Sequence, residues 1–512
     1  MTSFTVTTGT ILTNTDPFAS FTVTTGTILT NTDPFATFQS HNQRAVVAGE
    51  RILVALDHAT AWHTPSTVPP ADVYSEWGIH ASDDGGLTWQ AVLVRRVMGA
   101  DLRPPSIQVF DASDPASLIY IVSCTDTDNL ASMEIDIYHA DSITLGMPPV
   151  ETITIPNLCT AKLSTAIVRS STIFPFLAVL TRDGTPDDTN FSVIVLDGVT
   201  GMPILSPKGG TGTDVYPYLV NLLKVFSNSP PDASSTPGQQ FLQDPCLLMD
   251  AFGNSLVMTM TGDAYSFPTP TAPSETNYSC ITSMRYDLTS STFQSLQNEV
   301  LTIPVMIAPQ QPPPPQQPLP QQPLPQEPPG TQYPTLLVRE IGPQYNSYLT
   351  NQGVCPLYYH FLCVHRSTPG ANLMGRYVRV SRATGAKQEC ESLMTVEGTG
   401  LRFMYLFWNA GARLYVLATD IENQLILYVI YSEDSGDSWH LYTTLQFPVQ
   451  DWEIYAPGSY QGIGISRNAT ATATTTTTAA ERYLFFVVTM YRPPPVPTLT
   501  SSDVRSFRIT IP

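Results

Sequence analysis

Two distant copies of one short motif constrain the fold of this chain more than any other feature of its sequence. The pattern Ser-x-Asp-x-Gly-x-(Thr/Ser)-Trp occurs at residues 82–89 and again at residues 432–439. A central glycine lets the backbone reverse sharply, and the aspartate carboxylate is suited to accept hydrogen bonds from N–H groups of the same turn. Apolar residues typical of strands precede both copies, at residues 77–80 and 425–431. Each motif is therefore predicted to form the tip of a β-hairpin.

The motif resembles the Asp-box of the sialidase and BNR-repeat β-propellers, and both copies match it at every defining position. The resemblance implies a propeller fold, in which Asp-boxes act as stabilising turns rather than as sites of chemistry. The residues that match are Ser82, Asp84, Gly86, Thr88 and Trp89 in the first copy, and Ser432, Asp434, Gly436, Ser438 and Trp439 in the second.

The rest of the chain also favours an all-β fold. From about residue 40, runs of β-branched and aromatic residues alternate with turn sequences, and no long amphipathic helical pattern interrupts them. The runs form about seven units, with six as the alternative count, at a spacing that fits four-stranded blades with insertions. We therefore predict a β-propeller over residues 39–512, interrupted by a Pro/Gln-rich insertion at 308–330 and a Thr/Ala-rich loop at 469–480.

The N-terminal region is duplicated without a single change. Residues 3–19 read SFTVTTGTILTNTDPFA, and residues 20–36 repeat them. Seventeen residues are too few to bury a core of their own, so they lie on the chain's own propeller, on a neighbouring subunit, or on nothing, as a flexible tail would. Their β-branched and aromatic content favours an anchoring arm over residues 1–38 that adds a strand to the edge of another sheet. The predicted contact residues of the arm are Phe4, Val6, Ile11, Leu12, Phe18, Phe21, Val23, Ile28, Leu29 and Phe35.

Composition limits the classes of partner. A formal net charge of −19 and the scarcity of lysine argue against binding to nucleic acid or to anionic membrane surfaces. No apolar run reaches the length of a transmembrane helix, and the N-terminal residues lack the basic region and apolar core of a secretory signal. Seven cysteines without a Cys-x-x-Cys pattern predict neither a zinc site nor a complete disulfide framework. We expect no cofactor and no metal.

The resemblance to sialidases implies glycoside hydrolysis as the candidate enzymatic activity. In sialidases three arginines bind the substrate carboxylate, a Tyr/Glu pair supplies the nucleophile, and an aspartate acts as acid/base. The first blade of that family carries an aromatic residue followed by Arg-Ile-Pro, and the nearest sequence here, residues 43–46, keeps only Arg44. No spacing selects a triad among the remaining arginines, so we predict no catalytic residue.

Histidines and acidic residues supply the remaining candidates for chemistry. His58 and His63 would face opposite sides of a strand, which favours ordinary core or surface histidines. The acidic residues between 126 and 136 have oxygen ligands that suit a hard cation such as Ca²⁺, but a solvated face is the favoured interpretation.

Two functions follow from these observations. The first is a non-enzymatic structural or binding propeller, anchored or assembled through its repeated arm, such as a virion surface or capsid-associated spike or an extracellular filament subunit. It would contact a protein partner or another copy of itself, with a glycan or host receptor as a further ligand. The alternative is a sialidase-like glycoside hydrolase or a lectin that uses the central face. We place the protein on a virion or extracellular surface, with the cytoplasm as the alternative.

Overall fold

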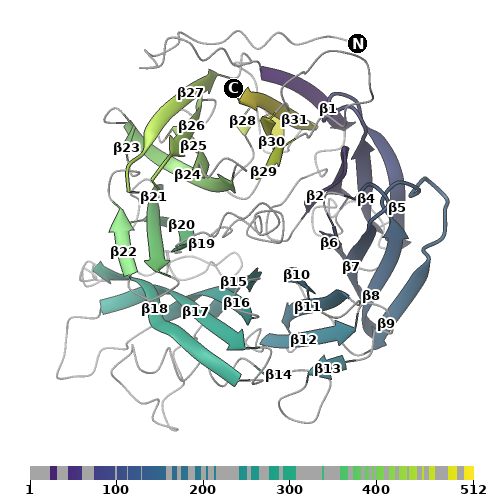
Figure 1. Ribbon diagram of the computed structural model, residues 1–512, viewed down its shortest axis with the longest axis horizontal. Coiled ribbons are helices and arrows are strands. Elements are labelled where there is room, and N and C mark those ends of the chain that lie inside the picture. The colour runs from purple at the N-terminus through teal and green to yellow at the C-terminus, as the bar shows by residue number, and fades with distance from the viewer. Residues whose placement is uncertain are drawn as a thin grey trace, which may run out of the picture.

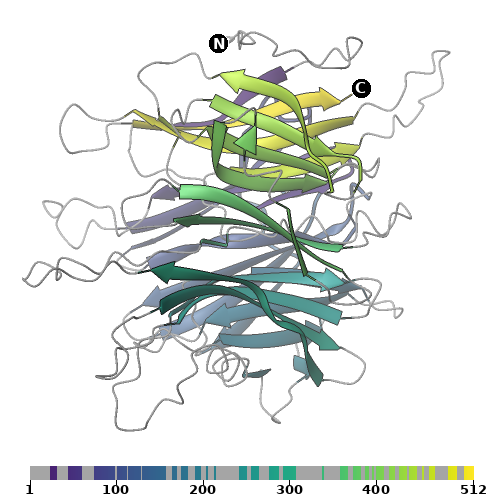
Figure 2. The same cartoon turned by 90° about the vertical axis from the view of Figure 1, so that its left-hand side faces the viewer.

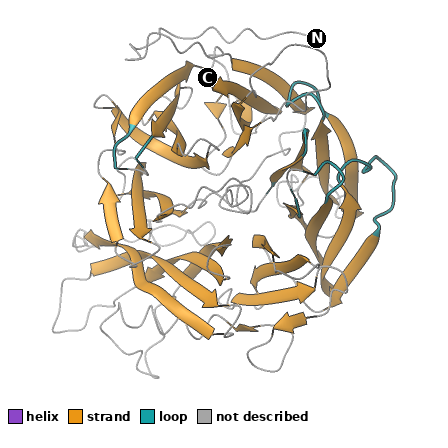
Figure 3. Cartoon of the chain, viewed as in Figure 1, coloured by secondary structure: helices purple, strands orange, loops and turns teal. Residues whose placement is uncertain are grey.

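Strands make up almost all of the described structure. The computed structural model describes strands β1 to β31 and the connecting residues 44, 49–50, 83–89, 110–111, 114–117, 140–150, 433–434 and 437–439. Figure 3 shows these residues as strands and loops alone. In this part of the chain there is no helix with the length and apolar character needed to cross a membrane.

The described strands form seven antiparallel sheets of four or five strands each. The first sheet along the chain contains β2 (Ala45–Ala48), β3 (Arg51–Ala59), β4 (Tyr74–Ser82) and β5 (Gln90–Met98). The second contains β6 (Asp101–Val109), β7 (Leu118–Thr127), β8 (Leu130–His139) and β9 (Glu151–Pro156). The third contains β10 (Ser164–Arg169), β11 (Pro175–Arg182), β12 (Phe191–Asp197), β13 (Pro203–Leu205) and β14 (Thr213–Asp214).

The next three sheets repeat this organisation. The fourth contains β15 (Phe241–Asp250), β16 (Ser255–Ala264), β17 (Thr276–Asp287) and β18 (Thr292–Met306). The fifth contains β19 (Leu337–Val338), β20 (Tyr358–Arg366), β21 (Leu373–Ser381) and β22 (Lys387–Cys390). The sixth contains β23 (Thr395–Val396), β24 (Thr399–Trp408), β25 (Leu414–Asp420), β26 (Ile426–Ser432) and β27 (His440–Gln446).

The last sheet combines the two ends of the described chain. Its strands are β28 (Glu453–Ile454), β29 (Tyr460–Ser466), β30 (Arg482–Arg492), β31 (Ser501–Ile511) and β1 (Val23–Asn31). Figure 1 shows β1 beside β31, and Figure 2 shows the same neighbours from a second direction.

The sheets follow one another around a ring. In Figure 1, β2, β6, β10 and β15 lie toward the centre, whereas β5, β9, β18 and β27 lie toward the rim. Strands adjacent in sequence pair within most of the sheets, so the chain runs back and forth from centre to rim before it enters the next sheet; β14, which pairs with β12, and β28, which pairs with β30, are exceptions. Antiparallel sheets arranged radially in this way define a β-propeller, as the sequence predicts.

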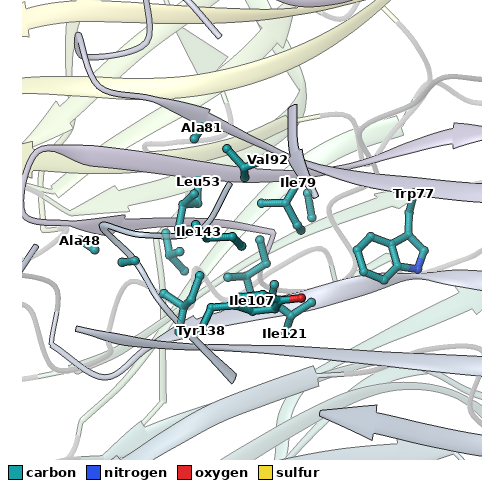
Figure 4. Close-up of a cluster of buried hydrophobic side chains, with 14 residues drawn as sticks. Ala48, Leu53, Trp77, Ile79, Ala81, Val92, Ile107, Ile121, Tyr138 and Ile143 are labelled. Carbon is teal, nitrogen blue, oxygen red and sulfur yellow. The ribbon is translucent and has the colours of Figure 1, made fainter. Parts of the chain in front are cut away.

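The hydrophobic core lies between neighbouring sheets, because inner strands are covered on both faces. Alternate residues of β2 and β3 point to opposite sides. Val46 and Leu53 pack with Ile107 and Ile121 of the second sheet. The cluster that they form also contains Trp77 of β4 (Figure 4). The residues between them in β2 and β3 pack against the last sheet instead, in a second cluster of Ile28, Ala45, Val47, Ile52, Val54, Leu56, Phe485, Val487 and Val504. Both faces of β2 and of the first part of β3 are therefore apolar.

Strand β1 completes the last sheet from within the same chain. It pairs antiparallel with β31, from Val23 opposite Ile509 to Asn31 opposite Ser502, with a shift in register between Thr27 and Leu29. Residues 23–31 belong to the second copy of the duplication, so this part of the predicted arm lies on the chain's own propeller. That position is one of the alternatives left open by the sequence.

Candidate functional site

The first Asp-box is a turn held by the side chain of Asp84. Its Oδ1 accepts hydrogen bonds from the Ser82 hydroxyl (2.8 Å) and from the N–H groups of Leu87 (3.0 Å) and Thr88 (2.9 Å). Its Oδ2 accepts the Thr88 hydroxyl at 2.5 Å. The N–H of Gly86 donates to the Ser82 hydroxyl oxygen at 2.8 Å. Burial alone would raise the pKa of Asp84, but the hydrogen bonds from Thr88, Ser82 and Leu87 outweigh it and lower that pKa.

The second Asp-box, at residues 432–439, repeats this arrangement. Asp434 accepts hydrogen bonds from the Ser432 hydroxyl (2.8 Å) and from both the N–H (2.8 Å) and the hydroxyl (2.5 Å) of Ser438. Burial opposes ionisation of Asp434, yet these hydrogen bonds lower its pKa to about 2. Both boxes therefore keep an ionised carboxylate inside the turn at neutral pH. Gly436 lies outside the described residues.

The first box also binds the last sheet, through Trp89. The indole N–H donates to the Gly86 carbonyl and to the hydroxyl oxygen of Ser506 in β31, each at 3.0 Å. The Ser506 hydroxyl donates in turn to the Gly86 carbonyl at 2.7 Å. The Trp89 ring lies 5.8 Å from the ring of Phe485 in β30, centroid to centroid. Residues more than 400 positions apart are thereby joined at one turn.

Strand β1 is seated directly against this turn. A Cβ atom at Gly26 would lie 2.2 Å from the Gly86 carbonyl oxygen and 2.8 Å from both the Leu87 carbonyl oxygen and the Ser506 hydroxyl. No side chain fits at such distances, so the close approach requires glycine. Ile28, two residues further along β1, is buried in the cluster with Phe485. We call the turn at residues 82–89 and β31, which together hold β1, the closure site.

The closure site accounts for only some of the residues predicted for the arm. Val23, Ile28 and Leu29 lie in β1, and Ile28 is buried. The remaining arm residues lie outside the described part of the chain: Phe4, Val6, Ile11, Leu12, Phe18, Phe21 and Phe35. No sequence pattern indicates Ser506. The only sequence signal for Gly26 is the repeat of that glycine at position 9.

Arg44, the nearest candidate for the sialidase arginine, is buried inside the scaffold. Its Nη1 lies 3.4 Å from Oδ2 of Asp57, and the two side chains are only 1% and 2% exposed. A guanidinium that binds a substrate carboxylate must reach solvent. In this structure Arg44 instead holds a buried carboxylate of the neighbouring strand β3.

Arg51 joins the first and second sheets. Its guanidinium donates to the carbonyl oxygens of Ala140 (2.8 Å), Asp141 (3.0 Å) and Ile143 (3.2 Å) in the loop after β8. Its Nε lies 3.3 Å from the carboxylate of Asp83, which lies within the first Asp-box. The planar fork of arginine suits this convergence of acceptors.

Two of the acidic residues between 126 and 136, Glu134 and Asp136, serve contacts between sheets. Arg95 of β5 forms ion pairs with Glu134 and with Asp136 of β8, the latter at 3.7 Å. The Thr152 hydroxyl donates to Asp136 at 2.7 Å. Among the described residues no group of His, Cys, Asp and Glu side chains is arranged to hold a metal ion.

A polar network of two histidines crosses the first sheet, and no sequence pattern indicates it. Nε2 of His58 lies 2.9 Å from Nε2 of His80, and Nδ1 of His58 lies 3.1 Å from Glu76, which also contacts Arg96 at 2.5 Å. Gly78 makes room for the His58 ring, since a Cβ there would lie 2.4 Å from it. Burial, followed by the proximity of His58, lowers the pKa of His80 to about 4. His80 is thus neutral at physiological pH and nearly inaccessible.

Comparison with known proteins gives structural similarities but no sequence match. No protein-family model and no curated protein sequence matches this chain. Among solved structures, it is similar to the subtype N11 neuraminidase-like protein of A/flat-faced bat/Peru/033/2010 (H18N11), with a TM-score of 0.31, 8% identity and coverage of 93% of this chain and 96% of that one.

Two other similar structures are a PL25 ulvan lyase and a protease propeller. The ulvan lyase gives a TM-score of 0.42 at 8% identity, over 93% of this chain and 95% of the other. The β-propeller domain of the Trilobed protease from Pyrococcus furiosus gives 0.36 at 5% identity, over 89% and 94%. Because these scores are low, the assignment to the β-propellers rests on the strand pairing and ring arrangement of the chain itself.

Proposed function

We propose that this protein is a non-catalytic β-propeller that works as a structural and binding module and is anchored to its partner through the repeated N-terminal segment. We also propose one blade for each of the seven sheets, and a distant relationship to the Asp-box propellers on the basis of the two boxes. The proposal is carried by one observation: a copy of the repeat forms a strand that the closure site holds in register.

The use of the described arginines supports a scaffold rather than a hydrolase. Arg44 is buried against Asp57, Arg51 is bound to a loop of the next sheet, and Arg95 is paired with the carboxylates of β8. These side chains connect strands and sheets, whereas a sialidase needs several guanidinium groups turned toward a common substrate.

The expected setting is an assembly at a virion or extracellular surface, in which the rim loops face a glycan or receptor. A rigid ring carries variable loops without loss of its core, and the low lysine content and net charge of −19 suit contact with proteins or neutral glycans better than with polyanions.

Deletion of one copy of the repeat tests this function. Because the copies are identical, removing residues 3–19 leaves a chain that still contains β1. We expect this variant to remain a folded propeller with an unchanged melting temperature but to lose self-association or partner binding, measured by size-exclusion chromatography with light scattering and by electron microscopy. A matched control removes seventeen residues from the insertion at 308–330.

Two results would contradict the proposal. If the full-length chain and the variant without residues 3–19 show the same association state and the same partner binding, the repeat is not an anchor. Hydrolysis of a fluorogenic sialoside by the purified full-length protein would show that the propeller is catalytic and would replace the proposal by the sialidase-like alternative.

A further inference from the structure

The contacts that hold β1 in the closure site depend on residues that the chain contains twice. Residues 6–14 have the sequence VTTGTILTN, which is identical to that of β1. Gly9 and Ile11 of the first copy correspond to Gly26 and Ile28 of the second. The closure site thus recognises a glycine that approaches the Gly86 carbonyl and an isoleucine in the cluster with Phe485. Both copies satisfy these requirements.

We propose that the closure site of one molecule accepts residues 6–14 of a second copy of this chain in place of its own β1. This inference rests on the proposed function and names the partner of the repeat. Main-chain pairing with β31 supplies the affinity, as in other cases of strand addition, and the seat for Gly9 beside the Asp-box turn supplies the register. Each molecule offers one strand and accepts one, so exchange links copies of the chain.

The lengths of the connections decide when exchange occurs. β1 is joined to β2 by residues 32–44, whereas residues 6–14 are joined to β2 by residues 15–44. For closure within one molecule, the longer connection lowers the equilibrium constant only about three- to fourfold. Fully extended, it spans roughly 100 Å, enough to reach a neighbouring molecule. Closure within the chain dominates in dilute solution, and exchange grows with protein concentration.

Glycine variants of the full-length chain test whether the two copies are interchangeable. Gly26→Val places a side chain against the Gly86 carbonyl and disables β1, and Gly9→Val disables the first copy in the same way. We expect Gly9→Val to be a stable monomer and Gly26→Val to retain a near-normal melting temperature while forming dimers or larger assemblies as the protein concentration rises. The double variant, which has no fitting strand, should melt several degrees lower than either single variant.

The outcomes separate the alternatives. If Gly26→Val is destabilised as much as the double variant, the first copy does not fit the closure site and the inference fails. If Gly26→Val is stable and remains a monomer at every concentration, the first copy closes its own ring, and the second copy of the chain is not the occupant.

Disulfide trapping between two separately labelled full-length chains identifies the partner directly. Thr27 lies opposite Arg505 in the ladder, so the corresponding residue of the first copy is Thr10. Opposed Cα atoms in antiparallel strands lie at distances that suit a disulfide. We expect a mixture of Thr10→Cys and Arg505→Cys chains to yield a cross-linked pair with these two positions joined, identified by peptide mass spectrometry. Ser3→Cys, outside the strand, is the control and should not cross-link to position 505.

The cross-linking experiment and the deletion of residues 3–19 distinguish failure of this inference from failure of the proposed function. If deleting residues 3–19 abolishes assembly but the Thr10–Arg505 cross-link does not form, the repeat binds another partner and only the present inference falls. If that deletion leaves assembly unchanged, the proposed function itself falls.

Discussion

The carboxylate of Asp84 accepts hydrogen bonds from Ser82, Leu87 and Thr88, and the turn shaped by these bonds touches both β1 and β31. An exposed turn of this kind would ordinarily tolerate substitution. Here its backbone is one wall of the closure site, because the Gly86 carbonyl accepts hydrogen bonds from Trp89 and Ser506. A substitution of Asp84 should therefore affect both the first sheet and the last sheet.

Replacement of Asp84 by alanine is expected to lower the free energy of unfolding by about 1–3 kcal/mol, the usual cost of leaving several polar partners unsatisfied. Urea denaturation followed by tryptophan fluorescence measures the change. Glu151→Ala is the matched control. That carboxylate is exposed at the start of β9, so its removal should cost less than about 0.5 kcal/mol. Equal losses in both variants would contradict the role assigned to Asp84.

His80 should make the stability of the propeller depend on pH between about 4 and 6.5. Its pKa lies near 4 in the folded chain against an ordinary value of 6.5, so between these limits the unfolded chain binds the additional proton. Stability is then highest above pH 6.5 and falls as the pH is lowered toward 4. Each unit of pKa corresponds to roughly 1.4 kcal/mol, and we expect a loss on the order of 1–3 kcal/mol.

Comparison with His80→Gln isolates this effect from the titration of the carboxylates. Glutamine retains a donor toward His58 without ionising in this range, so the variant should show a flatter stability curve between pH 4 and 6.5. Unfolding by urea at a series of pH values measures both curves. Parallel curves for the two proteins would show that His80 does not contribute to the pH dependence.

At the scale of elements, contacts between sheets are made by side chains that leave one strand and bind the backbone of the next sheet. Arg51 is the best example, because it binds carbonyl oxygens of Ala140, Asp141 and Ile143 after β8. These hydrogen bonds join the first two sheets, which also share the core cluster around Trp77.

Arg51→Lys should weaken this connection although it preserves the charge. An ammonium group cannot span three carbonyl oxygens in the way that a planar guanidinium does, and loss of charge-assisted hydrogen bonds costs about 1.5–3 kcal/mol. We expect this loss in chemical denaturation, together with faster hydrogen exchange in residues 140–143. Unchanged exchange there would contradict the contact. Arg96→Lys, whose side chain is half exposed, is the control.

The elements were more predictable than the contacts between them. Both Asp-box turns follow from a local pattern, since Asp84 and Asp434 bind groups no more than four residues away. The strands follow from runs of β-branched residues. The partnership of Trp89 with Ser506 and the pairing of His58 with His80 could not be predicted, because they depend on how separate strands and sheets come together.

At the scale of the whole molecule, ring closure depends on a strand from the opposite end of the chain. Deletion of residues 3–36 removes both copies and leaves β31 with a free edge and the cluster around Phe485 without Ile28. We expect a lower melting temperature and a tendency to aggregate, because an open strand edge pairs with other chains. Scanning calorimetry and light scattering measure both. A melting temperature equal to that of the intact chain would show that β1 contributes nothing to closure.

The direction of β1 has a practical consequence. Since Val23 lies opposite Ile509, the chain enters β1 at the same corner of the ring where β31 ends. A donor dye attached just before Val23 and an acceptor dye attached after Ile511 would therefore be neighbours in every ring closed by its own β1 and far apart in any molecule whose own strand has been displaced. Energy transfer between the two ends would report, in real time, whether each ring is closed by its own strand.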